Sequence, residues 1–327
     1  MKFMIAGLGS IGRRHLRNLV TLGERDIILY RTHQATLPDE ELAGYPVMTD
    51  LKDSLAHRPE AVIVANPTAL HLDVAIPAAE AGCHLLIEKP MSHSMDGVDR
   101  LRKAVSFGKG QVLVGFQFRF HPGLIQIANL LGQGAIGRPL SVRIHWGEFL
   151  PNWHPWEDYR GGYAVRSDLG GGVILTLCHP LDYLRWLLGN IQELFAFGGL
   201  LGELEIEVED TAEISLRFSS GVVGSVHLNY NQRPPVHRLE IVGTAGTIRW
   251  DNADGAVHIS RAGAAWEITP VPDGFERNWM FLEEMRHFIA VSKGIAKPIC
   301  SLEDGIWALR LALSAHQSIA MGVKITF

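Results

Sequence analysis

The chain of 327 residues is 47% hydrophobic and 20% charged, which is enough apolar material for a large core and for two domains rather than one. Its 30 Lys and Arg against 35 Asp and Glu give a formal net charge of −5, which argues against a nucleic-acid partner or a polybasic membrane contact. The longest stretch without a charged residue, Phe120–Gly137, is interrupted by polar residues and a proline, and the first residues do not resemble a secretory signal. These features predict a cytoplasmic protein with no membrane span.

The first third of the chain alternates short apolar runs with stretches of helical periodicity. Strands that are buried on both faces read as continuous apolar runs, and their alternation with helices predicts a parallel sheet built from right-handed crossover units. The predicted strands are Lys2–Ala6, Asp26–Tyr30, Ala61–Ala65, His84–Ile87 and Val112–Gly115, and the predicted helices are Gly12–Leu22, Leu51–Ala56, Ala69–Ala81 and Ser94–Phe107.

After Pro122 the pattern becomes strand-rich. Apolar residues occupy every second position in Thr211–Phe218 and Val222–Asn229, which is typical of a sheet with one covered face. The remaining predicted elements are helices at about 123–131, Val173–Leu188, Asn278–Val291 and Leu302–Ala320, a strand near 140–149, and further strands between Gln192 and Thr269.

This pattern predicts an α/β fold with a doubly wound parallel sheet over residues 1–120. Residues 121–327 are expected to form a second α/β domain on a large open, mainly antiparallel sheet. Because a bare apolar sheet face would aggregate, we expect a homodimer or homotetramer.

A glycine-rich turn follows the first predicted strand. Its sequence, Gly7-Leu8-Gly9-Ser10-Ile11-Gly12, matches GxGxxG and opens a helix, which is the context that dinucleotide binding requires. The first glycine permits the turn, the second lets the backbone approach the pyrophosphate, and the third lets the helix pack on the strand. A turn without a ligand is the alternative.

The end of the second strand bears on the choice between NAD and NADP. NAD-binding chains commonly carry an acidic residue there, but this sequence has Arg31 and no acid. An arginine can pair with the 2′-phosphate of NADP, so the sequence slightly favours NADP over NAD. Arg31 could equally stack on adenine or face water.

Glu88-Lys89-Pro90 lies at the carboxyl end of the strand His84–Ile87, where ligands of open α/β sheets bind. Considered alone, Lys89 could be an ordinary surface lysine.

Several motifs occur in the order found in one family, and together they cover the full chain. They are Gly7–Gly12, Asn66-Pro67-Thr68 with His71, Ala81-Gly82, Glu88-Lys89-Pro90, Arg119-Phe120-His121-Pro122, Gly170-Gly171-Gly172 with His179, and Gly243-Thr244-Ala245-Gly246. The chain thereby resembles the glucose–fructose oxidoreductase, inositol dehydrogenase and MocA family of NAD(P)-dependent oxidoreductases. The resemblance implies a dinucleotide-binding Rossmann domain and a substrate-binding and oligomerisation domain, with the substrate between them.

The resemblance also implies residue roles. Lys89 would be the catalytic lysine, in contact with the reacting oxygen and the cofactor ribose, and a cis Lys89–Pro90 peptide is expected. Arg119 would lie near the domain junction and bind substrate. The cofactor residues are expected to be Gly7, Gly9, Ser10, Ile11, Gly12, Arg31, Asn66, Pro67, His71, Glu88 and Lys89.

The implied reaction is hydride transfer between nicotinamide and a secondary hydroxyl or ketone of a sugar, cyclitol or sugar derivative. Such a reaction needs a cation for the developing alkoxide and a group that moves a proton. We assign the first task to Lys89 and the second to His179, although a lone helical histidine can be structural.

The sequence departs from the family pattern before His179. The family commonly places an aspartate one helical turn earlier, where this chain has Thr176, which cannot carry negative charge. Asp182, three residues after His179, could orient the histidine or form a structural salt bridge.

The aromatic loop 151–160 suggests a wall for a sugar-like substrate, because aromatic faces stack on pyranose rings. An oligomer contact is the alternative for this loop. The residues expected to bind substrate are Arg119, Trp156, Tyr159, Tyr163, Arg166 and His179.

Other site chemistries lack their patterns. The 15 histidines form no HExxH motif, the three cysteines form no CxxC, and no GxSxG turn is present, so we expect no metal and no serine hydrolase site. Two alternatives stay open: an NAD-dependent glycosidase of the same fold, and a non-catalytic dinucleotide-binding sensor.

Overall fold

A computed structural model describes residues 1–32, 37–153, 155 and 157–327. The predicted substrate residue Trp156 lies outside the described residues. The chain divides into two compact units, Met1–Gln117 with Glu276–Leu309 and Phe118–Phe275 with Arg310–Phe327. The expected division into 1–120 and 121–327 stays a prediction. Among the described residues, every helix is too short or too polar to cross a lipid bilayer.

The first unit contains a six-stranded parallel sheet in the order β3-β2-β1-β4-β5-β6. The strand order reverses between β1 and β4, and ligands bind beyond the carboxyl ends of the strands at such a point. The strands are β1 (Phe3–Ala6), β2 (Ile27–Tyr30), β3 (Val47–Met48), β4 (Ala61–Val64), β5 (His84–Glu88) and β6 (Val112–Gly115). The predicted doubly wound parallel sheet is confirmed.

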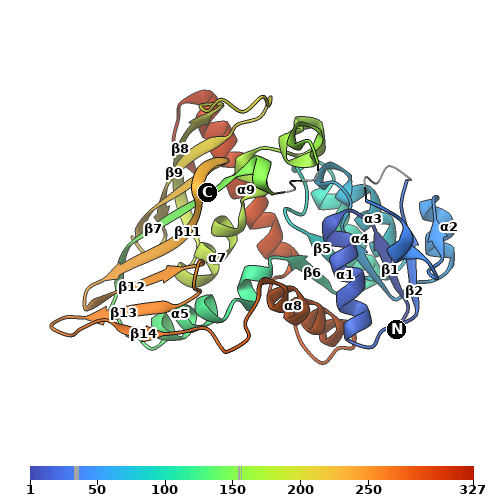
Figure 1. Cartoon of the computed structure of the whole chain (residues 1–327), viewed down its shortest axis with the longest axis horizontal. Helices are drawn as coiled ribbons and strands as arrows, with labels where there is room; N and C mark the ends of the chain where they lie inside the picture. The colour runs from blue at the N-terminus through green and yellow to red at the C-terminus, as the bar shows by residue number, and fades with distance from the viewer. Residues whose placement is uncertain (33–36, 154, 156) are drawn as a thin grey trace. The chain divides into compact units, whose positions relative to one another are not determined.

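Helices flank this sheet (Figure 1). The helix α1 contacts β1 and β4 and packs on α8, whereas α3 contacts β4 and β5 and packs on α4. Asp50 caps α2, since its side chain accepts a hydrogen bond from the N–H of Asp53 at 2.9 Å. The elements are α1 (Ser10–Thr21), η1 (Glu40–Leu42), α2 (Leu51–Ala56), η2 (Thr68–Leu70), α3 (His71–Glu80), α4 (Val98–Gly108) and α8 (Arg277–Ser292).

The second unit contains a nine-stranded sheet in the order β14-β13-β12-β11-β7-β10-β9-β8-β15. Its pairs are antiparallel except for β7 with β10, so the sheet is mixed and mainly antiparallel, as predicted (Figure 1). The strands are β7 (Pro139–Phe149), β8 (Ile191–Gly199), β9 (Thr211–Phe218), β10 (Val223–Asn229), β11 (Asn231–Gly243), β12 (Gly246–Asp251), β13 (Val257–Arg261), β14 (Glu267–Thr269) and β15 (Ile325–Thr326).

The expected single helix Val173–Leu188 is two helices, and that prediction was wrong. The helix α6 (Val173–Thr176) ends before Leu177, and α7 (His179–Leu188) begins after Cys178. Pro180 explains the break, because proline has no N–H to continue the bonding pattern and favours the first turn of a helix. His179 therefore opens a helix instead of lying within one.

The other helical elements are α5 (Pro122–Gly132), α9 (Leu302–Met321), and the short 3₁₀ turns η3 (Gln117–Phe120), η4 (Leu150–Asn152), η5 (Tyr159–Gly161), η6 (Tyr163–Val165) and η7 (Ser167–Leu169).

Candidate active site

Two glycines of the GxGxxG turn are required by close backbone contacts. Gly7 follows β1 with a φ of +91°, and a Cβ there would lie 2.4 Å from the backbone nitrogen of Asn66, just beyond β4. A Cβ on Gly12 would lie 1.9 Å from the carbonyl oxygen of Gly7. The turn thus packs against the residues that follow the carboxyl end of β4 (the exit of β4), at the point where the strand order reverses.

Gly9 has the opposite surroundings. A Cβ on Gly9 would meet nothing within 4 Å, so the space beside its backbone is open. Ser10 and Ile11 follow at the start of α1, where the first N–H groups of a helix lack intrahelical partners and favour an anion. The open backbone and the helix terminus together fit the pyrophosphate of a dinucleotide.

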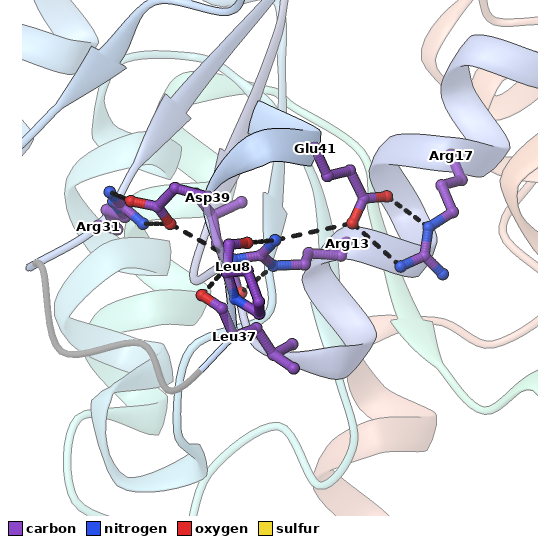
Figure 2. A network of polar contacts seen from close by, with 8 residues as sticks. Leu8, Arg13, Arg17, Arg31, Leu37, Asp39 and Glu41 are labelled. Atoms are coloured by element: carbon purple, nitrogen blue, oxygen red, sulfur yellow. Dashed lines mark hydrogen bonds and ion pairs between the residues drawn. The ribbon is translucent and has the colours of Figure 1, made fainter. Parts of the chain in front are cut away.

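The end of β2 carries a pair that the sequence did not predict. Nη1 of Arg31 donates to Oδ1 of Asp39 at 2.6 Å, and Nη2 donates to Oδ2 at 2.5 Å (Figure 2). Arg13 approaches the same carboxylate at 3.6 Å. The pairing raises the pKa of Arg31, chiefly through the hydrogen bonds to Asp39. The arginine that the sequence offered to a 2′-phosphate is therefore neutralised by an acid of its own chain.

Arg13 connects the segment that carries Asp39 to the glycine turn through hydrogen bonds. Its buried guanidinium donates to the carbonyl of Leu8 at 3.0 Å, to that of Leu37 at 3.1 Å, and to that of Pro38 (Figure 2). Glu41 in the same segment pairs with Arg17 of α1, and this pairing lowers the pKa of Glu41. Residues 37–41 are thus bound to the nucleotide turn and to α1.

A single histidine links the exits of β4 and β5. Nε2 of His71 lies 2.9 Å from the carbonyl oxygen of Asn66, and Nδ1 lies 3.0 Å from that of Pro90. The Lys89–Pro90 peptide is cis. His71 is 1% exposed, and burial lowers its pKa despite the two carbonyls. His71, which was expected to line the cofactor site, thus joins the turn after Asn66 to the turn that carries Lys89.

Two further predicted cofactor residues, Asn66 and Pro67, follow β4. Nδ2 of Asn66 donates to the carbonyl of Leu70 at 2.9 Å, while Oδ1 has no hydrogen-bond partner among the described residues. Pro67 precedes the turn η2. The backbone of Asn66 lies beside Gly7, and its side-chain oxygen is an acceptor that a bound ligand could use.

Glu88 is buried directly beside Lys89. Nε2 of His15 lies 2.6 Å from Oε1 of Glu88, and the backbone N–H of Lys89 donates to Oε2 at 3.2 Å. Burial acts to raise the pKa of Glu88, but the hydrogen bond from His15 and the charges of His15 and Lys89 outweigh it, so the pKa is lowered. A fixed carboxylate therefore lies at the base of the lysine turn.

Glu284 of α8 completes a buried cluster that the sequence did not predict. One ligand atom from each of His15, Glu88 and Glu284 lies within 4.8 Å of the others. Both carboxylate oxygens of Glu284 lack a hydrogen-bond partner among the described residues. Burial, aided by the charge of Glu88, raises the pKa of Glu284 well above its usual range. The protonated form of Glu284 is thus favoured beside the ionised form of Glu88.

In the second unit, His179 lies among aromatic rings. It is 2% exposed, and its ring centroid lies 5.0 Å from that of Phe118 and 5.5 Å from that of Trp146. His237 stacks on Trp146 at 4.1 Å and is bonded to the hydroxyl of Tyr183 at 3.0 Å. These contacts fix the surroundings of the candidate proton-transfer residue.

Asp182, which was expected either to orient His179 or to form a structural salt bridge, lies against Arg119. Nε and Nη2 of Arg119 donate to its two carboxylate oxygens at 2.9 and 2.7 Å. The guanidinium carbon also lies 5.9 Å from the ring centroid of Trp186. The predicted substrate residue Arg119 therefore takes part in a buried ion pair. Thr176 ends α6 and is buried.

The remaining predicted substrate residues lie on successive 3₁₀ turns. Tyr159 begins η5 and Tyr163 begins η6, with Tyr163 40% exposed. Arg166 follows η6 and donates to Asp168 at 3.0 and 2.5 Å. These side chains are partly or fully exposed, so they remain accessible to a ligand or to a second chain.

Comparison with known proteins identifies the class. A family model described as the oxidoreductase family, NAD-binding Rossmann fold, matches residues 1–116, and one described as the GFO/IDH/MocA C-terminal domain matches residues 124–249. The chain is thus an oxidoreductase with an NAD-binding Rossmann fold. It belongs to the GFO/IDH/MocA family, as the sequence motifs predicted.

Relatives of known name cover the full chain. An uncharacterized oxidoreductase YrbE of Bacillus subtilis is 30% identical over 98% of this chain and 95% of its own length. The myo-inositol 2-dehydrogenase of Thermotoga maritima is 29% identical over 98% of this chain and 96% of its own. A solved levoglucosan dehydrogenase in complex with NADH and levoglucosan superposes with a TM-score of 0.86 at 20% identity, covering 100% of this chain and 99% of that one.

Proposed function

We propose that the chain transfers a hydride between nicotinamide and a secondary hydroxyl or ketone of a sugar, cyclitol or sugar derivative. The named relatives that act on inositol and levoglucosan support this substrate class. The observation that carries the proposal is the position of Lys89 at the carboxyl end of β5, beside a turn built for a dinucleotide. The dinucleotide would accept or supply the hydride.

Lys89 is assigned to the reacting oxygen. A cation at that oxygen stabilises the alkoxide that develops as a hydride leaves the carbon. The fixed carboxylate of Glu88, and His71 through the carbonyl of Pro90, support the turn from which Lys89 extends. His179 is assigned to the proton that the hydroxyl loses, and Arg119, Trp156, Tyr159, Tyr163 and Arg166 to substrate contacts.

For the cofactor we propose NAD. The sequence slightly favoured NADP on the ground that Arg31 was available for a 2′-phosphate. The pair with Asp39 supports the reverse preference, because the carboxylate neutralises Arg31 and would repel a phosphate. NAD-binding chains commonly carry an acid at the end of β2. In this chain we assign that role to Asp39, which follows the last residue of β2, Tyr30, by nine positions.

We further propose a cytoplasmic homodimer or homotetramer. Large apolar side chains of the second unit, including Phe197, Leu201 and Ile268, are 60–70% exposed, which supports burial against another copy. The native mass measured by light scattering tests this, and a monomer at working concentration would contradict it.

The central test is a screen of sugars, cyclitols, uronic acids and nucleotide sugars with NAD and NADP, read by absorbance of the reduced cofactor. Net reduction of NAD with a sugar or cyclitol supports the proposal. Cleavage of a glycoside with no net change in the cofactor would instead identify the glycosidase. Dinucleotide binding with no turnover on any substrate would identify the sensor.

Variants then test the two assigned residues. Lys89→Ala should lower kcat by a factor of about 10²–10⁴ while dinucleotide binding, followed by fluorescence titration, is kept. Lys103→Ala, an exposed lysine of α4, is the matched control and should change neither. His179→Asn should lower kcat with circular dichroism unchanged. Unaltered turnover in either variant would overturn that residue's assignment.

A further inference from the structure

A hollow lined by arginines lies between α1 and α8 in the first unit. Its volume is about 330 Å³, within the range of small-molecule sites, and it is lined by Arg14, Arg17, Asn18, Glu276, Arg277 and Asn278. The three residues of α1 are spaced i, i+3 and i+4 and therefore share one helix face. The two walls are joined by a hydrogen bond from Nδ2 of Asn278 to Oδ1 of Asn18 at 3.1 Å.

The charges in this hollow are not balanced. Three arginines and one acidic residue, Glu276, line the hollow, although the chain as a whole has a net charge of −5. Arg17 pairs with Glu41. Within the described ranges, neither Arg14 nor Arg277 forms a salt bridge with a carboxylate.

Arg14 is held in place although it has no such partner. It is partly buried, and its guanidinium carbon lies 4.5 Å from the ring centroid of Phe281. Burial, followed by the charges of Arg277 and Arg17, lowers the pKa of Arg14. A multivalent anion would relieve this repulsion.

The hollow also lies at the start of α8. Arg277 is the first residue of this 16-residue helix, whose N-terminal N–H groups and dipole favour negative charge. Several guanidinium groups with backbone N–H groups suit a tetrahedral, doubly charged oxyanion better than a single carboxylate.

We propose that this hollow binds the phosphate group of a small phosphorylated metabolite. The site is separate from the dinucleotide turn. The pyrophosphate would lie at Gly9–Gly12, whereas Arg14, Arg17 and Asn18 lie further along α1. The neighbouring Arg13 points instead to the carbonyls of Leu8 and Leu37. The inference does not depend on which sugar or cyclitol the enzyme oxidises.

The test is calorimetric titration of the full chain, saturated with NAD, with inorganic phosphate and with ribose 5-phosphate, and with ribose as the uncharged control. Both phosphates should bind and ribose should not. Arg277→Gln and Arg14→Gln should each weaken binding by at least about tenfold, since a hydrogen bond to a charged group contributes about 1.5–3 kcal/mol.

The matched control is Arg286→Gln, which removes one exposed positive charge from the same helix and should leave phosphate affinity unchanged. Arg277 is exposed, so its replacement should not affect folding, and the melting temperature without phosphate checks this. If Arg286→Gln weakened phosphate binding equally, the effect would come from the overall charge of the protein and not from the hollow, which would contradict the proposal. Unchanged affinity in both site variants, or no phosphate binding to the NAD-saturated chain, would overturn the proposal.

Discussion

Arg119 and Asp182 form a bidentate ion pair across 63 residues of sequence, at 2.9 and 2.7 Å, with both residues 3% exposed. Removing one member of a buried pair leaves the other charged without compensation. Asp182→Asn should therefore lower the free energy of unfolding by about 3 kcal/mol, measured in urea. The exposed pair of Arg166 with Asp168 is the control, and Asp168→Asn should leave stability unchanged. Equal stability of the two variants would contradict a structural role for the buried pair.

The raised pKa of Glu284 should make the stability of the protein depend on pH. Its pKa is raised in the folded chain, while an unfolded glutamate ionises near about pH 4.3. Above that pH folding takes up a proton, so stability falls as the pH rises towards the folded pKa, by about 1.4 kcal/mol for each unit of pKa elevation.

Glu284→Gln cannot ionise and should lose this slope. Urea unfolding between about pH 5 and pH 9 measures it, a range in which the lowered pKa of Glu88 contributes little. Glu283→Gln, its neighbour on α8, should keep the wild-type slope. Parallel curves for wild type and Glu284→Gln would show that Glu284 is already ionised.

Asp39 should control the choice of cofactor. Asp39→Asn removes the charge that neutralises Arg31, so kcat/KM with NADP should rise by about tenfold, and kcat/KM with NAD should fall or stay level. Glu40→Gln, the adjacent exposed acid, should change neither value. An unchanged ratio of NADP to NAD in Asp39→Asn would count against the proposed role of the pair.

Two glycines of the GxGxxG turn should affect different properties: Gly9 dinucleotide binding, and Gly12 the stability of the fold. Gly9 has a φ of −72° and open space, so Gly9→Ala should fold normally yet bind dinucleotide more weakly, because the added methyl group occupies the place of the pyrophosphate. In Gly12→Ala the new Cβ meets the carbonyl of Gly7 at 1.9 Å. Overpacking of about 1–3 kcal/mol should exceed the gain of up to about 1 kcal/mol in helix propensity. Thermal melts and dinucleotide titration of both variants check this, and equal melting temperatures would refute it.

Much of the fold was predictable because buried strands and helices have characteristic patterns of apolar residues in the sequence. Strands covered on both faces, such as β4, appear as uninterrupted apolar runs. The strand β3 was missed because it has only two half-buried residues. The break before His179 could have been predicted from Pro180, since proline is typical of the first turn of a helix.

The site was predictable where its chemistry is contiguous in sequence, as in the glycine turn and in Glu88-Lys89-Pro90. It was not predictable where partners are far apart. His15 and Glu88 are separated by 73 residues, and Glu284 comes from a helix that no local motif connects to them. Asp39 was missed because its contact with Arg31 depends on the path of the intervening chain.

The imidazole of His71 accounts for one further property of the first unit. It reaches one carbonyl after each of two adjacent strands, so neither turn can shift without straining the other. A shift in either turn is therefore transmitted to the other through one imidazole ring.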